Sequence, residues 1–228
     1  MHPNRIICIQ QNKRNVNEHA YALYWMQQSQ RVHFNHALKH AIDIANQKRL
    51  PLVVYFGLWS GYPDANLRHF KFMLEGLKEV KEILLHFSIT FVLKIGKPEE
   101  EIMPLLKDAY HLVMDQGYLK HQKSMRSYVI NLAPDDLGID IVDTDLVVPV
   151  HIASQKVEYG AYTIRPKLKK LIPQFRDFKQ IEVLVNKQRL NISSDDSLTD
   201  IDLLLEKLNL DRSVKPSEIY HGGYLAAS

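Results

Sequence analysis

The feature that most constrains the fold is a regular alternation between short apolar runs and longer stretches with helical spacing. Short runs that are nearly all apolar are typical of strands buried on both faces. The predicted strands are residues 21–26, 52–57, 89–95, 110–114 and 139–142. Such alternation favours an α/β fold, here a five-stranded parallel sheet with helices on both faces.

Between the predicted strands, apolar residues recur three and four positions apart, which predicts amphipathic helices. The predicted helices are residues 34–45, 67–84 with Asn66 as N-cap, 98–107 and 125–132. Further on, Ser154 is a good N-cap for a helix that reaches Arg165. Residues 180–200 look like connecting chain with one possible short strand, and residues 203–208 predict a brief helix.

Composition is that of an ordinary globular protein, with 46% hydrophobic and 24% charged residues among 228. The net charge of +3 is too balanced to imply nucleic-acid binding, although it leaves room for a local basic patch. Cys8 is the single cysteine, which excludes an internal disulfide and a cysteine-rich zinc site. One thiol fits a reducing cytoplasm, and the longest apolar runs, such as residues 50–58, are too short to span a membrane. We therefore expect a cytoplasmic protein without a membrane partner.

Common ligand motifs are absent. The chain has no G-x-G-x-x-G, no G-x-x-x-x-G-K-[ST] and no G-x-S-x-G. His33, His36 and His40 share helical spacing, but no cysteine lies nearby, and solvated surface histidines are the more common meaning of such a pattern. We expect no metal there. Ligands of parallel sheets usually bind beyond the carboxyl ends of the strands, here residues 25–28, 57–60 and 115–118.

Four stretches carry a family resemblance. They are residues 24–38 (YWMQQSQRVHFNHAL), 68–77 (RHFKFMLEGL), 152–167 (IASQKVEYGAYTIRPK) and 210–216 (LDRSVKP). In this order, and without large gaps, they resemble the N-terminal domain of class II cyclobutane pyrimidine dimer DNA photolyases and the linker that follows it. The resemblance runs from about residue 21 to residue 223.

The resemblance implies a Rossmann-like α/β domain over residues 21–178, after an N-terminal extension of residues 1–20. Residues 179–228 resemble an inter-domain linker toward a helical flavin-binding domain that the sequence does not include. In the family, the N-terminal domain can hold a deazaflavin or folate antenna pigment. The helical domain binds reduced FAD and the flipped-out thymine dimer, which an electron from the excited flavin splits.

The function expected from this resemblance is that of a light-harvesting antenna domain. Light-dependent repair would need a separate FAD-binding photolyase domain as partner, so the chain alone is expected to be inactive and to meet damaged DNA only indirectly. The alternative is a non-catalytic remnant or protein-interaction module that keeps the fold. A nucleotide-binding α/β domain unrelated to repair is a third reading, which rests on fold analogy alone.

Some residues depart from the family pattern. The loop of residues 27–35 keeps Arg31 and Asn35 but has Gln28, Ser29 and Phe34 where the family has charged residues. In the later motif, Tyr162 likewise replaces an arginine. We expect these losses to indicate a relaxed constraint on the cofactor or inter-domain surface.

The candidate cofactor-binding residues are Trp25, Met26, Arg31, Asn35 and Asp115. Trp25 could stack on a flat pigment or be a core residue. Arg31 could orient a ligand, although bracing of backbone carbonyls in the loop is favoured. Asn35 could satisfy the loop from the first turn of a helix, and Asp115 could contact a ligand or cap the helix that starts near residue 119.

The candidate DNA-binding or partner-binding residues are Lys156, Glu158, Arg165 and Lys167. The basic members could attract DNA phosphates or an anionic pigment tail. A solvated positive face is the more common meaning of such a cluster, and Glu158 could pair with one of its bases.

Overall fold

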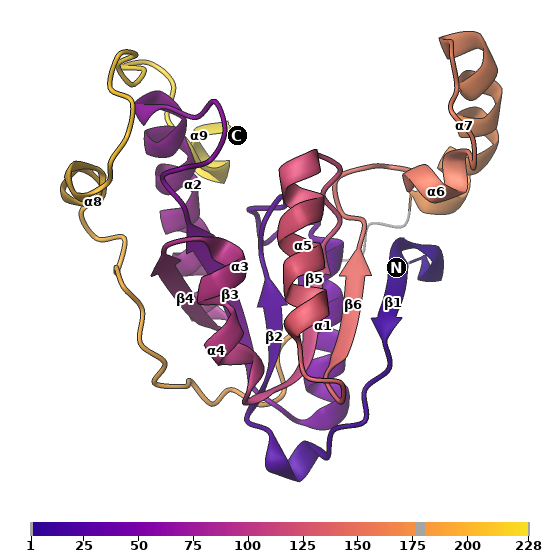
Figure 1. Ribbon diagram of the computed structural model, residues 1–228, viewed down its shortest axis with the longest axis horizontal. Coiled ribbons are helices and arrows are strands. Elements are labelled where there is room, and N and C mark those ends of the chain that lie inside the picture. Colours follow the sequence, from indigo (N-terminus) through magenta and orange to yellow (C-terminus); the bar gives the residue numbers. More distant parts are fainter. Residues whose placement is uncertain (1, 177–180, 228) are drawn as a thin grey trace.

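The computed structural model describes residues 2–176 and 181–227 and has a mixed sheet at its centre (Figure 1). The strands are β1 (Ile6–Gln10), β2 (Tyr21–Trp25), β3 (Leu52–Leu58), β4 (Thr90–Ile95), β5 (Ala109–Asp115) and β6 (Gly138–Val142). Their order across the sheet is β1-β6-β5-β2-β3-β4. Strands β2 to β6 pair in parallel, which confirms the predicted five-stranded parallel sheet.

A sixth strand, β1, was missed. It pairs antiparallel with β6, with Ile6 opposite Val142, and lies within the stretch predicted as an N-terminal extension. Its side chains are half-buried or exposed, as at a sheet edge. The sequence does contain a short apolar run at residues 6–9, but it is only four residues long and was not assigned to a strand.

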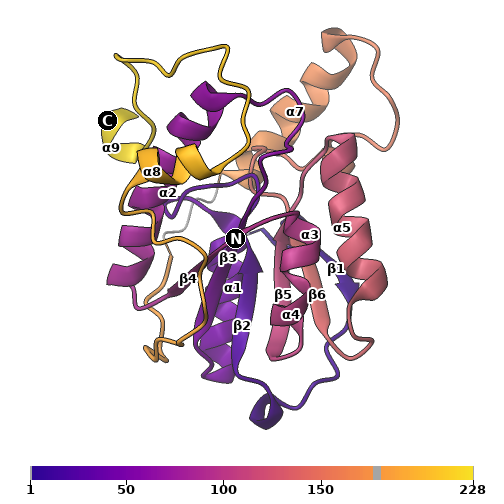
Figure 2. The ribbon, with the colours of Figure 1, turned by 60° about the vertical axis from the view of Figure 1, so that its left-hand side comes forward.

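Helices cover both faces of the sheet, as Figures 1 and 2 show. Helices α1 (His36–Lys48) and α2 (Leu67–His86) lie on one face, with α8 (Ile201–Lys207) packed against α2. The other face carries α3 (Pro98–Glu101), α4 (Met103–Leu106) and α5 (Lys120–Leu132). Each face has its own apolar core, because alternate residues of a strand point to opposite sides.

The sheet extends on both sides of β2. After β2 the chain adds β3 and β4 on one side, and it then crosses back to add β5 and β6 on the other side. This arrangement creates a topological switch point between the carboxyl ends of β2 and β5, where open α/β sheets usually bind ligands. The switch point lies at Trp25 and Asp115.

The region after β6 differs from the prediction. Ser154 is the C-cap of a short helix, α6 (Val150–Ala153), and not the N-cap of the next one. Helix α7 (Ala161–Phe175) begins only after Gly160. The Ser154 hydroxyl instead donates a hydrogen bond to Glu158, which folds the intervening loop back on itself.

Residues 181–195 contain no strand, contrary to the possible strand predicted there. They nevertheless run beside β4, where the backbone N–H of Asp195 donates to Leu93 and the Ser194 hydroxyl accepts from Leu93. This pairing covers an edge that would otherwise expose free backbone groups. The same segment covers part of α1, where Glu182 contacts Lys39.

The last described residues pack along α2. The backbone N–H of Gly222 donates to Glu75, and that of Tyr224 donates to Glu79. A short helix, α9 (Tyr224–Ala227), ends the described chain, which also has two 3-10 turns, Pro3–Arg5 and Val16–Glu18. No helix in residues 2–176 or 181–227 is long and apolar enough to cross a bilayer.

Candidate functional site

Asp115, the last residue of β5, organises the loop that follows β2. Its Oδ2 atom accepts hydrogen bonds from the backbone N–H groups of Gln27, Gln28 and Ser29 at 2.9–3.0 Å. Its Oδ1 atom accepts from the Tyr24 hydroxyl at 2.8 Å. Burial raises the pKa of the Asp115 carboxyl, and the hydrogen bonds from the loop oppose that rise. Both carboxyl oxygens are therefore occupied by the protein itself.

Asn35 closes the other end of this loop. It is the N-cap of α1, because its side-chain oxygen accepts from the backbone N–H of Leu38 at 2.8 Å. Its amide group donates to the Tyr24 hydroxyl and to the carbonyls of Ser29 and Arg31. The predicted role of Asn35 in satisfying the loop is confirmed, at the N-cap and not inside the first turn.

Arg31 and Ser29 tie the loop to the segment after β6. The guanidinium of Arg31 donates to the carbonyl of Thr144 and lies 3.8 Å from Asp145. The hydroxyl of Ser29, which is fully buried, donates to Asp145 at 2.6 Å. Arg31 thus braces a carbonyl, as favoured from the sequence. The replacement residue Ser29 is held by Asp145, and the expected relaxation of the cofactor or inter-domain surface stays a prediction.

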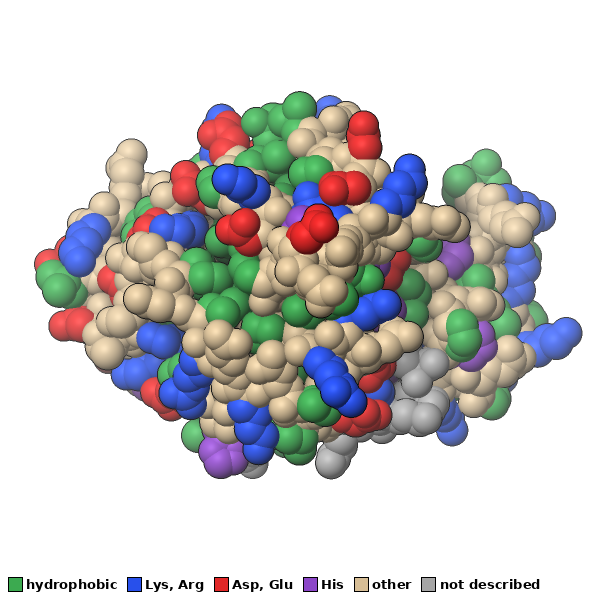
Figure 3. All heavy atoms as spheres, turned by 90° about the horizontal axis from the view of Figure 1, so that it is seen from below, with side chains coloured by type: hydrophobic (Ala, Val, Ile, Leu, Met, Phe, Trp, Pro, Cys, Tyr) green, Lys and Arg blue, Asp and Glu red, His purple; other side chains and the backbone are tan. Residues whose placement is uncertain are grey.

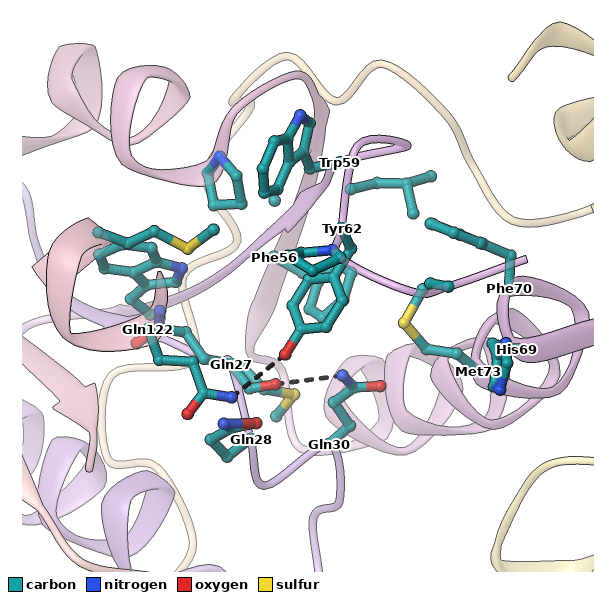
Figure 4. Close-up of a pocket in the computed structure, with 18 of the residues that line it drawn as sticks. Gln27, Gln28, Gln30, Phe56, Trp59, Tyr62, His69, Phe70, Met73 and Gln122 are labelled. Atoms are coloured by element: carbon teal, nitrogen blue, oxygen red, sulfur yellow. Dashed lines mark hydrogen bonds between the residues drawn. The ribbon is translucent and has the colours of Figure 1, made fainter. Parts of the chain in front are cut away.

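A cavity of about 400 Å³ opens beside this loop, at the carboxyl ends of β2 and β3 (Figure 4). Residues from β2, β3, α2, α3 and α5 and from the loops after β2 and β3 surround it. Its wall is largely aromatic and thioether. These members are Trp25, Met26, Phe56, Trp59, Tyr62, Phe70, Met73 and Met125.

The loop between β3 and α2 forms one wall of the cavity. Tyr62 in this loop accepts a hydrogen bond from the side-chain amide of Gln122 at 3.2 Å, and its ring meets His121 edge to face. Gln122 is fixed in turn, because its side-chain oxygen accepts from the backbone N–H of Leu119. Hydrogen bonds of Gln122 thereby link α5 to the loop between β3 and α2 and to the loop that precedes α5.

Polar groups at the cavity are few and uncharged on the side of the β2 loop. The side chains of Gln27, Gln28 and Gln30 lie together there, as Figure 4 shows, and Gln30 donates to the Gln27 carbonyl at 3.1 Å. The side-chain oxygen of Gln27 is buried and has no hydrogen-bond partner among the described residues. Such an atom is usually satisfied by water or a ligand donor. Among the residues placed around the cavity there is no lysine or arginine.

A family model described as DNA photolyase matches residues 22–185. This chain belongs to the DNA photolyase family. It is 40% identical over 158 residues to the deoxyribodipyrimidine photo-lyase of Methanothermobacter thermautotrophicus, covering 68% of this chain and 35% of that protein. It is 36% identical over 189 residues to the Arabidopsis thaliana enzyme of the same name, covering 82% of this chain and 38% of that protein.

Two solved photolyases share the fold. An archaeal photolyase from Sulfolobus tokodaii, solved with two FAD molecules and described as implying a novel light-harvesting cofactor, has a TM-score of 0.65 at 13% identity. The alignment covers 89% of this chain and 44% of that one. A class III photolyase from Agrobacterium tumefaciens has a TM-score of 0.59 at 14% identity, covering 82% and 38%. The chain spans about a third of the curated photolyases it matches, and corresponds to their N-terminal α/β domain.

In this photolyase domain, the five predicted cofactor residues separate into two groups. Trp25 and Met26 line the cavity and are also fully buried, so Trp25 is a core residue that borders the cavity. Arg31, Asn35 and Asp115 shape the loop beside the cavity and do not line it. Asp115 also does not cap α5, because the N-cap is Leu119 and the cap bonds come from Gln122. Pigment contact by any of them stays a prediction.

Sequence reasoning missed most of the cavity wall. Trp59 lies within the strand end at residues 57–60 that was named as a ligand region, but it was not singled out. Phe70 and Met73 were read only as the apolar stripe of a helix. A second tryptophan directly after a buried strand was the signal that could have found this wall.

The four candidate partner-binding residues lie on and before α7, away from the cavity. Glu158 pairs with Lys167, as predicted, and hydrogen bonds from Lys167 and Ser154 lower the pKa of Glu158 to about 2. Lys156 and Arg165 are exposed. The structure brings all four into one projecting region, and their binding role stays a prediction.

The three histidines considered as metal ligands diverge. His33 is exposed and its ring lies 5.2 Å from that of Tyr224, whereas His36 is buried. His40 contacts Asp140 at 2.8 Å, and His111 contacts the same oxygen at 3.0 Å. Within residues 2–176 and 181–227, no group of three or more histidine, cysteine or acidic residues could hold a metal ion. The expected solvation is wrong for His36, which is covered in the folded chain.

Proposed function

We propose that the cavity at the ends of β2 and β3 binds a flat, conjugated pigment and that the domain harvests light. The observation that carries this proposal is the cavity wall, where Trp25, Trp59, Phe56 and Tyr62 surround about 400 Å³. This volume falls within the roughly 300–1,000 Å³ of small-molecule sites. Aromatic rings favour planar, polarisable ligands because they offer large apolar contact at fixed geometry.

The polar groups fit a heterocyclic ring. The unpartnered side-chain oxygen of Gln27 could accept a hydrogen bond from a ring N–H, and Gln28 and Gln30 offer further amide groups beside it. A phosphate or carboxylate tail would find no lysine or arginine on the described wall, so it would extend outward. The heterocyclic ring of the pigment, and not its tail, would therefore make most of the contacts with the protein. Deazaflavin, folate and flavin all satisfy this description.

The pigment, when bound, would absorb blue or near-ultraviolet light and pass the excitation energy to a flavin. We infer that this flavin is an FAD held by a helical photolyase domain, on the same or on a separate chain. The support is the coverage of the curated relatives, of which the chain spans about a third. Light-dependent repair of pyrimidine dimers is proposed for that assembly.

A second candidate function is docking of another protein without photochemistry. The observation that favours it is a groove between the segment before α6 and helix α7. Val147, Val150 and Val157 line this groove and are exposed by 47%, 48% and 72%. Adjacent exposed apolar side chains often mark interaction sites.

An absorption spectrum of the purified protein tests the pigment proposal. We expect a bound band between about 350 and 450 nm, either as purified or after soaking with folate, deazaflavin or FAD, that is released on denaturation. Gln27→Ala should reduce pigment retention about tenfold, since a hydrogen bond contributes roughly 0.5–1.5 kcal/mol. The matched control is Gln188→Ala, an exposed glutamine far from the cavity.

The contrary result is equally clear. A protein that shows only aromatic absorption after soaking with all three pigments has no antenna site, and the docking function would then be favoured. Equal retention by the Gln27 and Gln188 variants would place the pigment elsewhere on the protein.

A further inference from the structure

The loop of residues 59–66, which connects β3 to α2, forms one wall of the aromatic cavity. Most of its residues line that cavity, namely Trp59, Tyr62, Pro63, Asp64 and Ala65. Residues 61–64, in the middle of the loop, are exposed to solvent on their other side. The loop therefore stands between the cavity and solvent.

Both ends of this loop are anchored by backbone hydrogen bonds. Just before it, the carbonyl of Leu58 accepts from the N–H of Gly96 at 3.0 Å. Just after it, the N–H of Leu67 donates to the carbonyl of Asp211 at 2.9 Å, and Asn66 caps α2. The two ends are thus fixed to the body of the domain.

The middle of the loop is bonded only weakly to itself. Within the part of the chain that the structure describes, the backbone of residues 60–65 donates two hydrogen bonds, from Tyr62 to Trp59 and from Ala65 to Tyr62. Both are 3.3 Å long, beyond the usual range of about 2.7–3.2 Å. Asp64 has a φ of 59°, a left-handed conformation that is uncommon outside glycine. Exposed segments with few hydrogen bonds open most easily.

Tyr62 connects this weakly bonded segment to α5. Its hydroxyl oxygen accepts from the side-chain amide of Gln122 at 3.2 Å, as Figure 4 shows, and lies 2.8 Å from Nε2 of His121. The amide of Gln122 is already oriented, because its oxygen accepts from the N–H of Leu119. The hydroxyl of Tyr62 is therefore free to donate its own hydrogen to His121.

Tyr62 carries this connection without help from its neighbours. Among residues 2–176 and 181–227, no other side chain of residues 60–65 makes a hydrogen bond or ion pair with another element. The loop is thus anchored at both ends and joined to the opposite side of the cavity by one hydroxyl. Loss of the two contacts of that hydroxyl would leave the middle of the loop unattached.

The loop also lies on the side from which a ligand reaches the cavity. Figure 3 shows the molecule from the amino ends of the parallel strands, where lysine, arginine and acidic side chains are interspersed. The cavity lies at the other end of these strands. Trp25, Met26 and Phe56 line it and are buried, so they close it toward the sheet. A flat ligand must therefore pass the loops at the carboxyl ends.

We propose that residues 59–66 form a lid over the aromatic cavity and that Tyr62 is the latch that holds this lid to α5. When the two contacts of the hydroxyl break, the loop moves away from α5 and a flat ligand enters. When they form again, the ligand is enclosed. The inference rests on the proposed binding of a pigment in this cavity, and it adds how the pigment enters and leaves.

Acrylamide quenching of tryptophan fluorescence tests the lid on the protein without a ligand. Trp59 lies on the loop and is partly exposed, whereas Trp25, the other tryptophan, is fully buried. Quenching therefore reports mainly on Trp59. Tyr62→Phe keeps the ring and removes the latch, and its quenching constant should rise about twofold, because losing hydrogen bonds raises the population of the open loop. Tyr128→Phe, at an exposed position of α5 outside the cavity, should match the wild type.

A second variant tests whether the contacts act together. His121→Ala removes the other partner of the hydroxyl and should also increase quenching of Trp59. The variant Tyr62→Phe/His121→Ala should add little to Tyr62→Phe alone, because residues that act through one contact are not additive.

Stopped-flow fluorescence with riboflavin, a flat and uncharged probe, tests passage through the lid. In Tyr62→Phe, the association and dissociation rate constants should both rise by up to about tenfold, while the dissociation constant changes by less than about threefold. A residue that only contacts the ligand would show a different pattern. Its loss would raise the dissociation rate and the dissociation constant together.

Two outcomes overturn the lid. One is equal quenching of Trp59 in Tyr62→Phe and Tyr128→Phe, whether or not riboflavin binds. The other is an increase in the dissociation rate of riboflavin alone, which would make Tyr62 a ligand contact. Increased quenching in Tyr62→Phe without binding of any pigment would support the lid and contradict the antenna proposal, so the two proposals fail separately.

Discussion

The Oδ2 atom of Asp115 accepts a hydrogen bond from the backbone N–H of Ser29 at 3.0 Å, so the end of β5 fixes the loop that follows β2. The two residues are 86 positions apart in the chain. They meet because β2 and β5 are neighbours at the switch point of the sheet. One wall of the aromatic cavity therefore depends on a carboxylate that does not line it.

Replacing this carboxylate should destabilise the domain. In Asp115→Asn, a neutral amide faces three backbone donors, and hydrogen bonds to charged groups are each worth about 1.5–3 kcal/mol. We expect the free energy of unfolding in urea to fall by about 3 kcal/mol. Asp135→Asn, at an exposed position, should change it by less than about 0.5 kcal/mol. Equal stability of the two variants would show that Asp115 does not hold the loop.

Tryptophan fluorescence should report directly on pigment binding. The chain has two tryptophans, Trp25 and Trp59, and both line the cavity. A bound pigment that absorbs near their emission should quench both, giving a saturable decrease during a titration with deazaflavin, folate or FAD. A decrease that stays linear with pigment concentration would contradict binding in this cavity.

Substitution of one wall residue sharpens that test. Trp59→Ala should weaken pigment binding about tenfold, because ring stacking contributes roughly 0.5–1.5 kcal/mol beyond buried area. Tyr128→Ala removes a partly exposed aromatic residue from α5 outside the cavity. The affinity of this control should equal that of the wild type.

The parallel strands and main helices were predictable because each leaves a local signature. Strand β3 is a continuous buried run, and α2 repeats apolar residues from Leu67 to Leu84 behind its cap Asn66. The edge strand β1 has an apolar run of only four residues, 6–9, and its side chains are half-buried or exposed, so its signature is weaker. The prediction of Ser154 as an N-cap was wrong because serine is equally suited to several capping and turn positions. Its hydroxyl donates to Glu158, which also accepts a hydrogen bond from Lys167.

The cavity was predictable only in its position. Parallel sheets bind ligands at their carboxyl ends, which located Trp25 and the end of β3. The lining of Phe70 and Met73 depends on how α2 packs over the sheet, which no local pattern specifies. The role of Asp115 likewise depends on a contact across 86 residues.

The Glu158–Lys167 pair gives a prediction for acid titration. Hydrogen bonds from Lys167 and Ser154 lower the pKa of Glu158 from 4.5 to about 2. The pKa of Glu158 is lowered only in the folded state. The ion pair therefore stabilises the fold of α7 and of the loop before it above about pH 4.5. That contribution is lost as pH falls through about 2. Carbon-13 NMR of the side-chain carboxyl should show a midpoint near 2.

Variants of two neighbouring lysines test the cause of that shift. Lys167→Ala should move the Glu158 midpoint upward toward 4.5, whereas Lys169→Ala, which lies on the exposed side of α7, should leave it near 2. A wild-type midpoint near 4.5, or equal midpoints in the two variants, would mean that the pair does not form in solution.

Gly222 should be required for docking of the last described residues on α2. A Cβ atom at this position would lie 1.7 Å from the carbonyl oxygen of Phe72, so the segment must move away from the helix. Gly222→Ala should therefore break the contacts of Gly222 with Glu75 and of Tyr224 with Glu79. Such overpacking costs about 1–3 kcal/mol.

Hydrogen–deuterium exchange measures this change. In Gly222→Ala, residues 219–227 should exchange about tenfold faster than in the wild type, while the exchange of the sheet stays unchanged. Ala226→Ser, at an exposed position of α9, is the control, and equal exchange in both variants would show that the segment does not pack on α2.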